Sequence, residues 1–121
     1  MSIEVKQLKE DEFIYGVFAT DKHKDGTVVD SGMCLTVAES EIGEDTFLSS
    51  YVFMHPGQPY TSVLCMGLAS YLNDSAYDKG TTPPNAKVKF KSLPGSRVGY
   101  ELVTIGEVQV GDQLLIDYDN A

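Results

Sequence analysis

Turn-forming residues recur at short intervals along this sequence and divide it into short pieces. The clearest of them are Lys24-Asp25-Gly26, His55–Tyr60, Asn73–Asn85, Pro94-Gly95 and Val110-Gly111-Asp112. Between them, several pieces alternate apolar and polar residues, as the strands of a half-buried sheet do. The pattern predicts a mainly β domain of about seven or eight short strands with one or two short helices.

The individual elements are predicted from alternation and from β-branched or aromatic content. The expected strands are Ile3–Leu8, Phe13–Ala19, Thr27–Asp30, Met33–Val37, Lys87–Leu93, Tyr100–Val108 and Gln113–Tyr118. Ser62–Leu72 is the best helix candidate, because its apolar residues recur at roughly helical spacing, although Gly67 disfavours a helix. Thr46–Met54 fits either a short helix or a strand. The acidic segment Glu39–Asp45 and the polar segment Asn73–Asn85 are expected to be loops.

The size and apolar content of the chain fit one compact domain. It has 121 residues, of which 42% are hydrophobic, enough for a core. No apolar run reaches the roughly 18 residues of a membrane span. The first residues, Met1–Lys6, lack the basic-then-apolar order of a signal peptide. We therefore expect a soluble protein of the cytoplasm or nucleus that is neither secreted nor bound to a membrane.

The charge balance is acidic, with 18 acidic and 9 basic residues and a net charge of −9. That charge repels nucleic acid phosphates, so direct DNA or RNA binding is not expected, and it favours basic partners. Solubility alone explains the charge equally well. The acidic residues Glu39, Glu41, Glu44 and Asp45 are most simply a solvated loop, although they could also attract a basic peptide.

The cysteines and histidines do not form a recognisable metal or thiol-catalysis motif. Cys34 and Cys65 lie far apart in apolar surroundings and not in a Cys-x-x-Cys pair, which argues against a zinc site. Two buried free thiols are favoured over a disulfide. His23, in a polar turn, and His55, beside Pro56-Gly57, are interpreted as surface histidines rather than general bases.

Three weak motifs gain meaning from their order. They are Tyr15-Gly16-Val17-Phe18-Ala19, Tyr71-Leu72-Asn73-Asp74-Ser75 with Pro84-Asn85-Ala86, and Leu114-Leu115-Ile116-Asp117-Tyr118. Together with Asp25–Val29, Tyr51-Val52-Phe53 and the terminal element Glu101–Tyr118, they resemble the SET-domain family of S-adenosylmethionine-dependent protein-lysine methyltransferases. The resemblance extends from about Phe13 to Tyr118.

The resemblance implies a single SET domain over residues 1–121, without pre-SET or post-SET zinc segments. Its length is similar to that of the smallest stand-alone members, such as those encoded by viruses. The implied fold is a mainly β, β-clip-like arrangement of small sheets. It contains a knot-like crossing, in which the final segment passes through a loop near Asn73–Asn85.

The resemblance also implies site residues for lysine. It makes Tyr118 the catalytic phenol, although a core tyrosine that closes the last strand is the alternative. Tyr51 would be a second catalytic and channel tyrosine, or ordinary packing. Tyr71 could reach either the lysine channel or the cofactor pocket, or could belong to the apolar face of the expected helix. The expected substrate is a basic protein such as a histone.

The S-adenosylmethionine site implied by the resemblance comprises Tyr15, Gly16, Asn73 and Asp74. Asn73 has an amide suited to the amino-acid end of the cofactor, although it could instead cap a helix. Tyr15 and Gly16 would contribute backbone, and Gly16 is equally explained as a strand bulge. Asn85 is expected to pin one loop beneath another.

Two further hypotheses follow from the departures from the family pattern. Ile14 stands where the family has a glycine, and Asp74 stands where it has a histidine. An inactive SET-like module that binds a basic peptide or partner protein is therefore the alternative function. Homodimers are also expected, because a SET core this short has little cover for its channel; apolar residues such as Val52, Phe53 and Met54 could contribute the interface.

Overall fold

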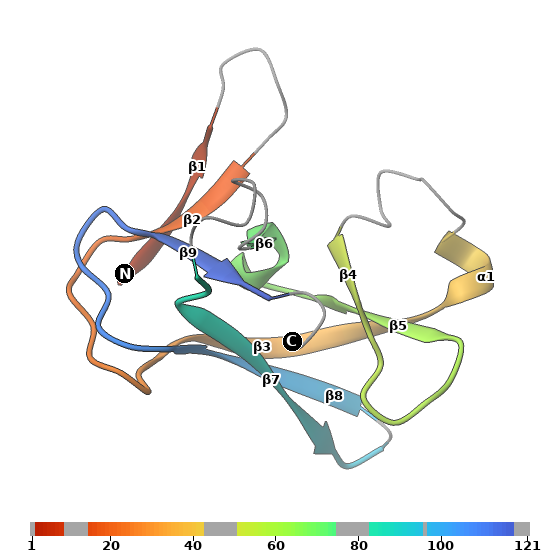
Figure 1. Cartoon of the computed structure of the whole chain (residues 1–121). Coiled ribbons are helices and arrows are strands. Elements are labelled where there is room, and N and C mark those ends of the chain that lie inside the picture. Colours follow the sequence, from red (N-terminus) through yellow and green to blue (C-terminus); the bar gives the residue numbers. More distant parts are fainter. Residues whose placement is uncertain (1, 9–14, 43–50, 75–82, 96, 118–121) are drawn as a thin grey trace.

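The computed structural model describes residues 2–8, 15–42, 51–74, 83–95 and 97–117. In this part of the chain the structure is mainly β, as the sequence predicts (Figure 1). The elements in chain order are β1 (Ile3–Gln7), β2 (Tyr15–Ala19), β3 (Val28–Ala38), α1 (Glu39–Ile42), β4 (Val52–Met54), β5 (Thr61–Cys65), the 3-10 helix η2 (Leu68–Tyr71), β6 (Asn73–Asp74), β7 (Ala86–Leu93), β8 (Arg97–Thr104) and β9 (Gln113–Ile116).

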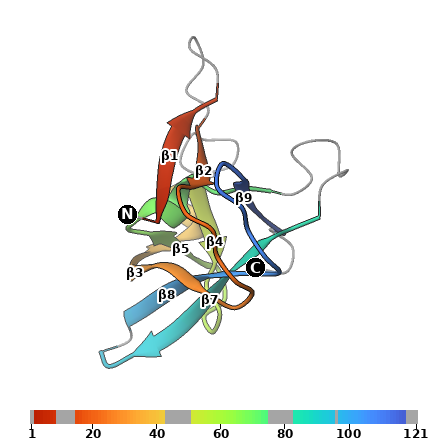
Figure 2. The same cartoon turned by 90° about the vertical axis from the view of Figure 1, so that its left-hand side faces the viewer.

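The described strands form two sheets, one of four strands in the order β1-β2-β9-β6 and one of five in the order β4-β5-β3-β8-β7. Seen from the side, β1 and β2 lie at one end of the molecule and β7 and β8 at the other (Figure 2). The long strand β3 is the centre of the larger sheet, because it pairs with β5 on one side and β8 on the other.

The hydrophobic core combines residues from both sheets. The larger sheet contributes Phe53, Val63, Val88, Val98 and Leu102, and the smaller sheet contributes Ile3, Val17, Leu114 and Ile116. The short helix η2 adds Ala69, and Leu72 follows it, so η2 is fixed by burial of its apolar side. At about 25 cal/mol per Å² of buried apolar area, this core is the main source of stability.

The predicted helix over Ser62–Leu72 is wrong. Its first part is strand β5, which pairs with β3 and β4, and only Leu68–Tyr71 is helical, as one 3-10 turn. Val63 and Cys65 are buried at alternate positions, so the apolar residues fit a strand as well as a helix. Gly67 is extended, with φ −165° and ψ −163°, so it separates strand β5 from the 3-10 helix η2.

Other boundaries also differ from the prediction. Thr27–Asp30 and Met33–Val37 are parts of one strand, β3, whose pairing with β8 shifts register between Val28 and Asp30. The acidic segment Glu39–Asp45 begins with the short helix α1 rather than with a loop. The side chain of Ile42, at the end of this helix, is buried. Thr46–Met54 ends in strand β4, and residues 43–50 lie outside the described part.

His23 and Phe53 were both predicted to lie at the surface, and both are buried. His23 is only 8% exposed, because its backbone pairs with Val108 and its Nε2 lies 3.1 Å from the Ser2 carbonyl oxygen. Phe53 is 7% exposed and packs edge-on against Phe90 in the core, so it is not an interface residue. His55 is half-buried, and its Nδ1 accepts hydrogen bonds from the backbone of Gly57 and Gln58.

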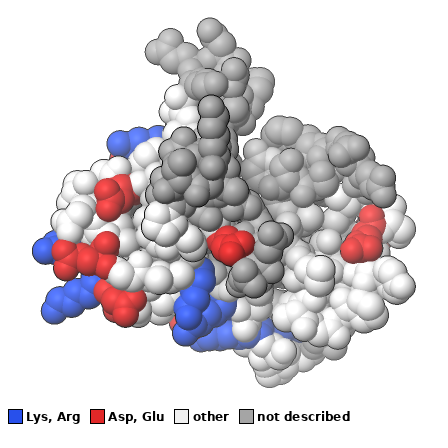
Figure 3. Space-filling view, in the orientation of Figure 1, with Lys and Arg blue, Asp and Glu red and all other residues white. Residues whose placement is uncertain are grey.

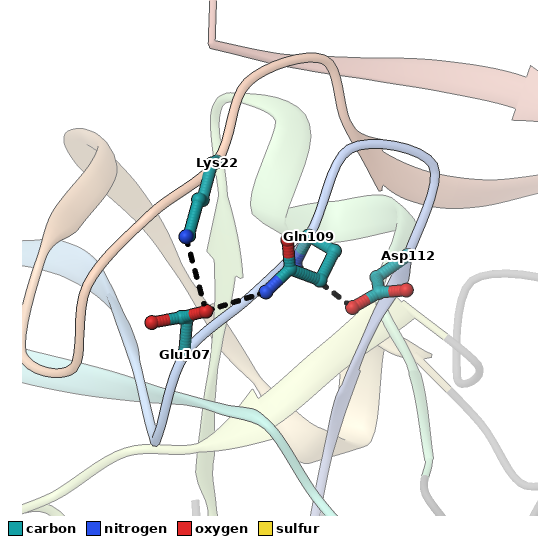
Figure 4. Close-up of polar contacts among 4 residues, drawn as sticks. All are labelled: Lys22, Glu107, Gln109 and Asp112. Carbon is teal, nitrogen blue, oxygen red and sulfur yellow. Dashed lines mark hydrogen bonds and ion pairs between the residues drawn. The ribbon is translucent and has the colours of Figure 1, made fainter.

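Surface polar contacts join the loop after β2 to the loop before β9 (Figure 4). Glu107 accepts a 2.6 Å hydrogen bond from Gln109 and lies 3.3 Å from the Lys22 ammonium. These contacts lower the pKa of Glu107, the hydrogen bond from Gln109 more than the pairing with Lys22. Asp112 accepts from the Gln109 backbone, which closes the turn that leads into β9. The solvent-exposed contacts fix loop shape and contribute little stability.

Asn85 makes the expected connection between segments far apart in sequence. Its side chain donates to the Gln113 carbonyl at 2.9 Å and accepts from the Leu115 N–H at 2.8 Å. Its backbone donates to Leu115 and accepts from Ile105. The parallel pairing of β6 with β9 brings the Asn73 segment to the same strand. The predicted meeting of the two motifs is confirmed. The predicted threading falls on residues 75–82 and 118–121, which lie outside the described residues.

Replacing Asn85 with alanine should lower the free energy of unfolding by about 2–4 kcal/mol, because two backbone groups of β9 lose their partners. Chemical denaturation measures the change. Gln58→Ala, which removes an exposed loop amide, is the control and should change stability by less than about 0.5 kcal/mol. Equal, small effects of both substitutions would show that Asn85 does not hold β9.

Candidate functional site

Asn73 lies where the three motifs meet. Its Nδ2 atom donates one hydrogen bond to the Tyr15 carbonyl at 2.9 Å and another to Gln113 Oε1 at 2.8 Å. Both N–H donors of the amide are thereby used to join β6 to β2 and β9. Asn73 is not a helix cap, because Leu72 occupies the C-cap position of η2. The side-chain atom through which Asn73 would contact a bound amino group is therefore its carbonyl oxygen.

Gly16 allows this close packing. It pairs regularly with Lys6 in the β1–β2 ladder, so it is not a bulge. A Cβ at Gly16 would stand 2.6 Å from Gln113 Oε1 and 3.2 Å from a ring carbon of Phe18. Only glycine leaves room for the Gln113 amide to reach Asn73. The interpretation of Gly16 as a site residue therefore has a physical basis in close approach.

Three tyrosines adjoin the Asn73 position. The Tyr71 ring lies edge-to-face with Tyr15 at 5.8 Å and with Tyr51 at 6.2 Å between centroids. Tyr71 is 37% exposed, and Tyr15 and Tyr51 are half-buried, so the cluster opens to solvent. Such edge-to-face pairs stabilise one another and present both ring faces and phenol oxygens. We call Tyr15, Tyr51 and Tyr71 the tyrosine cluster.

A buried polar network holds the start of η2, which carries Tyr71. Asp30 on β3 accepts a 2.8 Å hydrogen bond from the Tyr100 hydroxyl and a 3.2 Å bond from the Ala69 N–H. Burial, and then the hydrogen bond to Asp30, raises the pKa of Tyr100, so its hydroxyl remains a proton donor. Gly67 packs directly on this hydroxyl, and a Cβ there would overlap it.

The structure thus brings together most of the predicted site residues. Tyr15, Gly16 and Asn73 meet directly, and Tyr51 and Tyr71 join them through ring contacts. The backbone of Asp74 pairs with Ile116. Tyr118 and Ile14 lie outside the described residues, Tyr118 being the next residue after Asp117.

Gln113, Asp30 and Tyr100 were not predicted as site residues. Gln113 belongs to the terminal motif, but its role depends on a contact with Asn73, 40 positions away. Asp30 and Tyr100 lie 70 positions apart, and nothing in the local pattern of either residue indicates the pair.

Two features are absent from the part of the chain that the structure describes. No group of three or more His, Cys, Asp or Glu side chains is placed to hold a metal ion among the residues with described positions. In the same residues, no helix has both the length and the apolar content needed to cross a membrane.

Gly16→Ala should lower the free energy of unfolding by about 1–2 kcal/mol, because Gln113 must withdraw and its hydrogen bond to Asn73 is lost. The same substitution in a Gln113→Ala background should cost less, since the clashing amide is already gone. Gly57→Ala is the control, because the nearest atom to its Cβ would be 4.0 Å away. A full penalty in the Gln113→Ala background would contradict the proposed contact.

Comparison with known proteins gives a consistent result at the level of fold. No protein-family model matches the sequence, and no curated protein matches it. A Plasmodium falciparum protein assigned as a histone methyltransferase superposes with a TM-score of 0.71 at 19% identity, over 97% of this chain and 92% of that one. Polycomb Repressive Complex 2 of Chaetomium thermophilum in an autoinhibited conformation, bound to S-adenosylmethionine, superposes with a TM-score of 0.67 at 19% identity.

A humanized mutant of the same Chaetomium complex, bound to the inhibitor GSK126, gives a TM-score of 0.67 at 18% identity. These two matches include 96–97% of this chain but only 14–15% of the much longer Chaetomium chains. Matches over 96–97% of this chain take in both described sheets. The chain therefore has the SET-domain fold.

Proposed function

We propose that this protein transfers a methyl group from S-adenosylmethionine to a lysine of a basic protein, such as a histone. The observation that carries the proposal is the convergence of three separated motifs on Asn73, which bonds to both Tyr15 and Gln113. The tyrosine cluster lies beside that convergence. A substrate of this kind is consistent with a protein of the nucleus or cytoplasm.

The residues around Asn73 fit the cofactor by their chemistry. The Asn73 carbonyl oxygen and nearby backbone carbonyls are acceptors suited to an ammonium group, and the half-buried Tyr15 ring offers an apolar face. The backbone of Asp74 would contribute as well. When bound, S-adenosylmethionine supplies an electrophilic methyl group on a positively charged sulfur. Asn73, Gly16 and Gln113 keep β2, β6 and β9 in register around it.

The tyrosine cluster and Tyr118 would act on the lysine. A free lysine has a pKa of about 10.4 and is mostly protonated at neutral pH, so the site must favour the neutral amine. Aromatic walls from Tyr51 and Tyr71 remove water from the amine, which disfavours its charged form. A phenol oxygen of Tyr118 would orient the lone pair toward the methyl carbon. No strong base is required for this arrangement.

The negative net charge favours a basic substrate, but the surface charges do not define where that substrate would bind. The net charge of −9 attracts Lys- and Arg-rich peptides. Figure 3 shows that acidic residues are scattered on this face rather than gathered in one patch, and that a blue group of basic residues lies near its lower edge. Glu39 and Glu41 are exposed at the start of α1, where they could contact such a peptide.

Calorimetry with S-adenosylmethionine, followed by mass spectrometry of histones incubated with labelled cofactor, tests the proposal. Saturable cofactor binding and label on lysine are expected. A protein that binds neither cofactor nor basic peptide would refute methyl transfer. Binding of basic peptide without cofactor would instead support the inactive SET-like module.

Tyr118→Phe should remove most turnover while it keeps the fold and cofactor affinity. The substitution retains the aromatic ring, so stability should fall by only about 1 kcal/mol, the value of one hydroxyl hydrogen bond. The rate should fall far more, because the hydroxyl acts mainly in the transition state. Melting curves, calorimetry and methyl-transfer assays on one preparation separate these effects.

Tyr60→Phe is the matched control, because Tyr60 is 81% exposed in the turn between β4 and β5. It should leave melting temperature, cofactor affinity and turnover unchanged. Unchanged turnover in Tyr118→Phe would show that Tyr118 is a packing residue.

The outer face of the larger sheet supports the homodimer as a second part of the proposal. Paired residues of adjacent strands lie on the same face, and the pairs Leu35–Leu64 and Leu64–Val52 lie opposite the core. Leu35 is 52% exposed, and Met33 and Met54, on the same face, are 41% and 81% exposed. We propose that this uncharged face of β3, β4 and β5 packs on a second copy. The region around the β4–β5 turn is largely free of charged residues in Figure 3.

Leu35→Lys should weaken the dimer at least about tenfold, because each copy would have to bury a lysine charge in the apolar interface. Light scattering over a range of concentrations measures the change. Val110→Lys, at a 66% exposed position in the turn before β9, is the control and should leave the mass unchanged. A monomeric wild type at high concentration would refute the interface.

A further inference from the structure

Cys34 and Cys65 stand directly opposite each other on the antiparallel strands β3 and β5. Both are free thiols, and their Sγ atoms are 4.0 Å apart. Directly opposed residues in antiparallel strands have Cα atoms about 4.5–5.5 Å apart, within the range of about 4.4–6.8 Å that disulfides span. A bond between the two sulfurs therefore requires little backbone movement.

The two thiols differ in character. Cys34 is half-buried, whereas Cys65 is 2% exposed. The hydrogen bond between the two thiols lowers the pKa of Cys34, against an opposing effect of burial. The same hydrogen bond, burial, and the charges of Cys34 and Asp30 raise the pKa of Cys65. Cys34 is thus the more reactive nucleophile, and Cys65 is a protonated thiol within reach of it.

We propose that Cys34 and Cys65 are a reversible oxidation site for hydroperoxides. The Cys34 thiolate attacks the peroxide oxygen, the O–O bond breaks, and a sulfenic acid and, after protonation, water or an alcohol form. The Cys65 thiol then displaces hydroxide from the Cys34 sulfur, which gives a disulfide and a second water. Two thiols are oxidised by two electrons, and the peroxide is reduced by two. Two molecules of a small thiol then reduce the disulfide to the two cysteine thiols and are themselves joined in a disulfide.

The oxidation site is connected to the start of η2. Cys65 ends β5, and the following residue, Met66, donates to the Met33 carbonyl beside Cys34. Bond formation draws the sulfurs from 4.0 Å to about 2.0 Å. Gly67 cannot take up the shift freely, because it packs on the Tyr100 hydroxyl. Even a small shift of the Cys65 backbone would therefore be passed on to Ala69 and Tyr71, and so to the tyrosine cluster.

Treatment of the intact protein with hydrogen peroxide, followed by alkylation and peptide mass spectrometry, tests the chemistry. The expected product is a peptide pair joined through Cys34 and Cys65 that has lost two hydrogen atoms and is separated by dithiothreitol. Oxidation of Cys34 beyond the sulfenic acid while Cys65 remains free to alkylate would overturn the proposal. A disulfide between two copies, seen as a larger species on a non-reducing gel, would overturn it as well.

Cys34→Ala and Cys65→Ala are the matched controls. Neither can form the internal bond, and Cys65→Ala should accumulate a Cys34 sulfenic acid that reacts with dimedone. Circular dichroism verifies that each variant is folded, and Cys34→Ser replaces Cys34→Ala if that variant is not. Rapid dimedone labelling of Cys65 in the Cys34→Ala protein would reverse the assignment of attacking and resolving thiols.

The connection to the site has its own readouts, and its effect on the cofactor rests on the proposed function. Hydrogen exchange of residues 66–74 should rise on oxidation and return on reduction, whether or not the protein binds a cofactor. S-adenosylmethionine affinity should fall about tenfold in the oxidised protein and should not change in peroxide-treated Cys34→Ala. Unchanged exchange would refute the connection. Failure of the reduced protein to bind the cofactor would refute the proposed function alone.

Discussion

The placement of β9 between β2 and β6 is the constraint on which the remainder of the structure depends. This strand has only four residues, and it receives Asn85 through hydrogen bonds at Gln113 and Leu115. Without it, β1 and β2 would form an isolated two-stranded unit, and β6 would have no partner. The buried residues Leu114 and Ile116 then complete the core from the same short segment. Structure and site are therefore specified by the same few contacts.

The site follows from this arrangement because close approach leaves few alternatives. Asn73 uses both of its N–H groups to join neighbouring strands, and Gly16 provides the space. The tyrosine cluster lies at the open edge of this packed region, where rings are held by one another while one side remains accessible. Under the proposed function, this rigid support beneath an exposed aromatic surface would hold the side chain of a substrate lysine.

The sequence predicted the parts of the fold that depend on local pattern. Alternation identified β1 and β7 almost to the residue, and the motif order placed Asn73 near the terminal element. Ser62–Leu72 was assigned to the wrong class because a strand buried on one face and a short helix share its apolar spacing. Pairing with β3 decided between them, and such tertiary pairing is not visible in the segment.

The residues of the candidate site also differ in whether a sequence pattern or only a tertiary contact reveals them. Tyr15, Gly16 and Asn73 were proposed because a family pattern carries long-range information that propensity lacks. Gln113, Asp30 and Tyr100 make side-chain hydrogen bonds to partners 39 to 70 positions away, so no window of sequence around them contains the signal. His23 was wrongly predicted to be exposed, because it lies in a polar turn of the sequence. A β-bridge to Val108, which the local sequence does not reveal, buries it.

The long separation in sequence between β2 and β9 also determines when the domain can fold. Val17 pairs with Leu114, so the four-stranded sheet closes only after the β9 segment has been made. Pairing over such a separation gives a high contact order and a slow final step. During synthesis the β1–β2 hairpin must wait with its apolar face uncovered, because an isolated hairpin is only marginally stable. The nascent protein is consequently most vulnerable to aggregation and to holdase capture before the β9 segment leaves the ribosome.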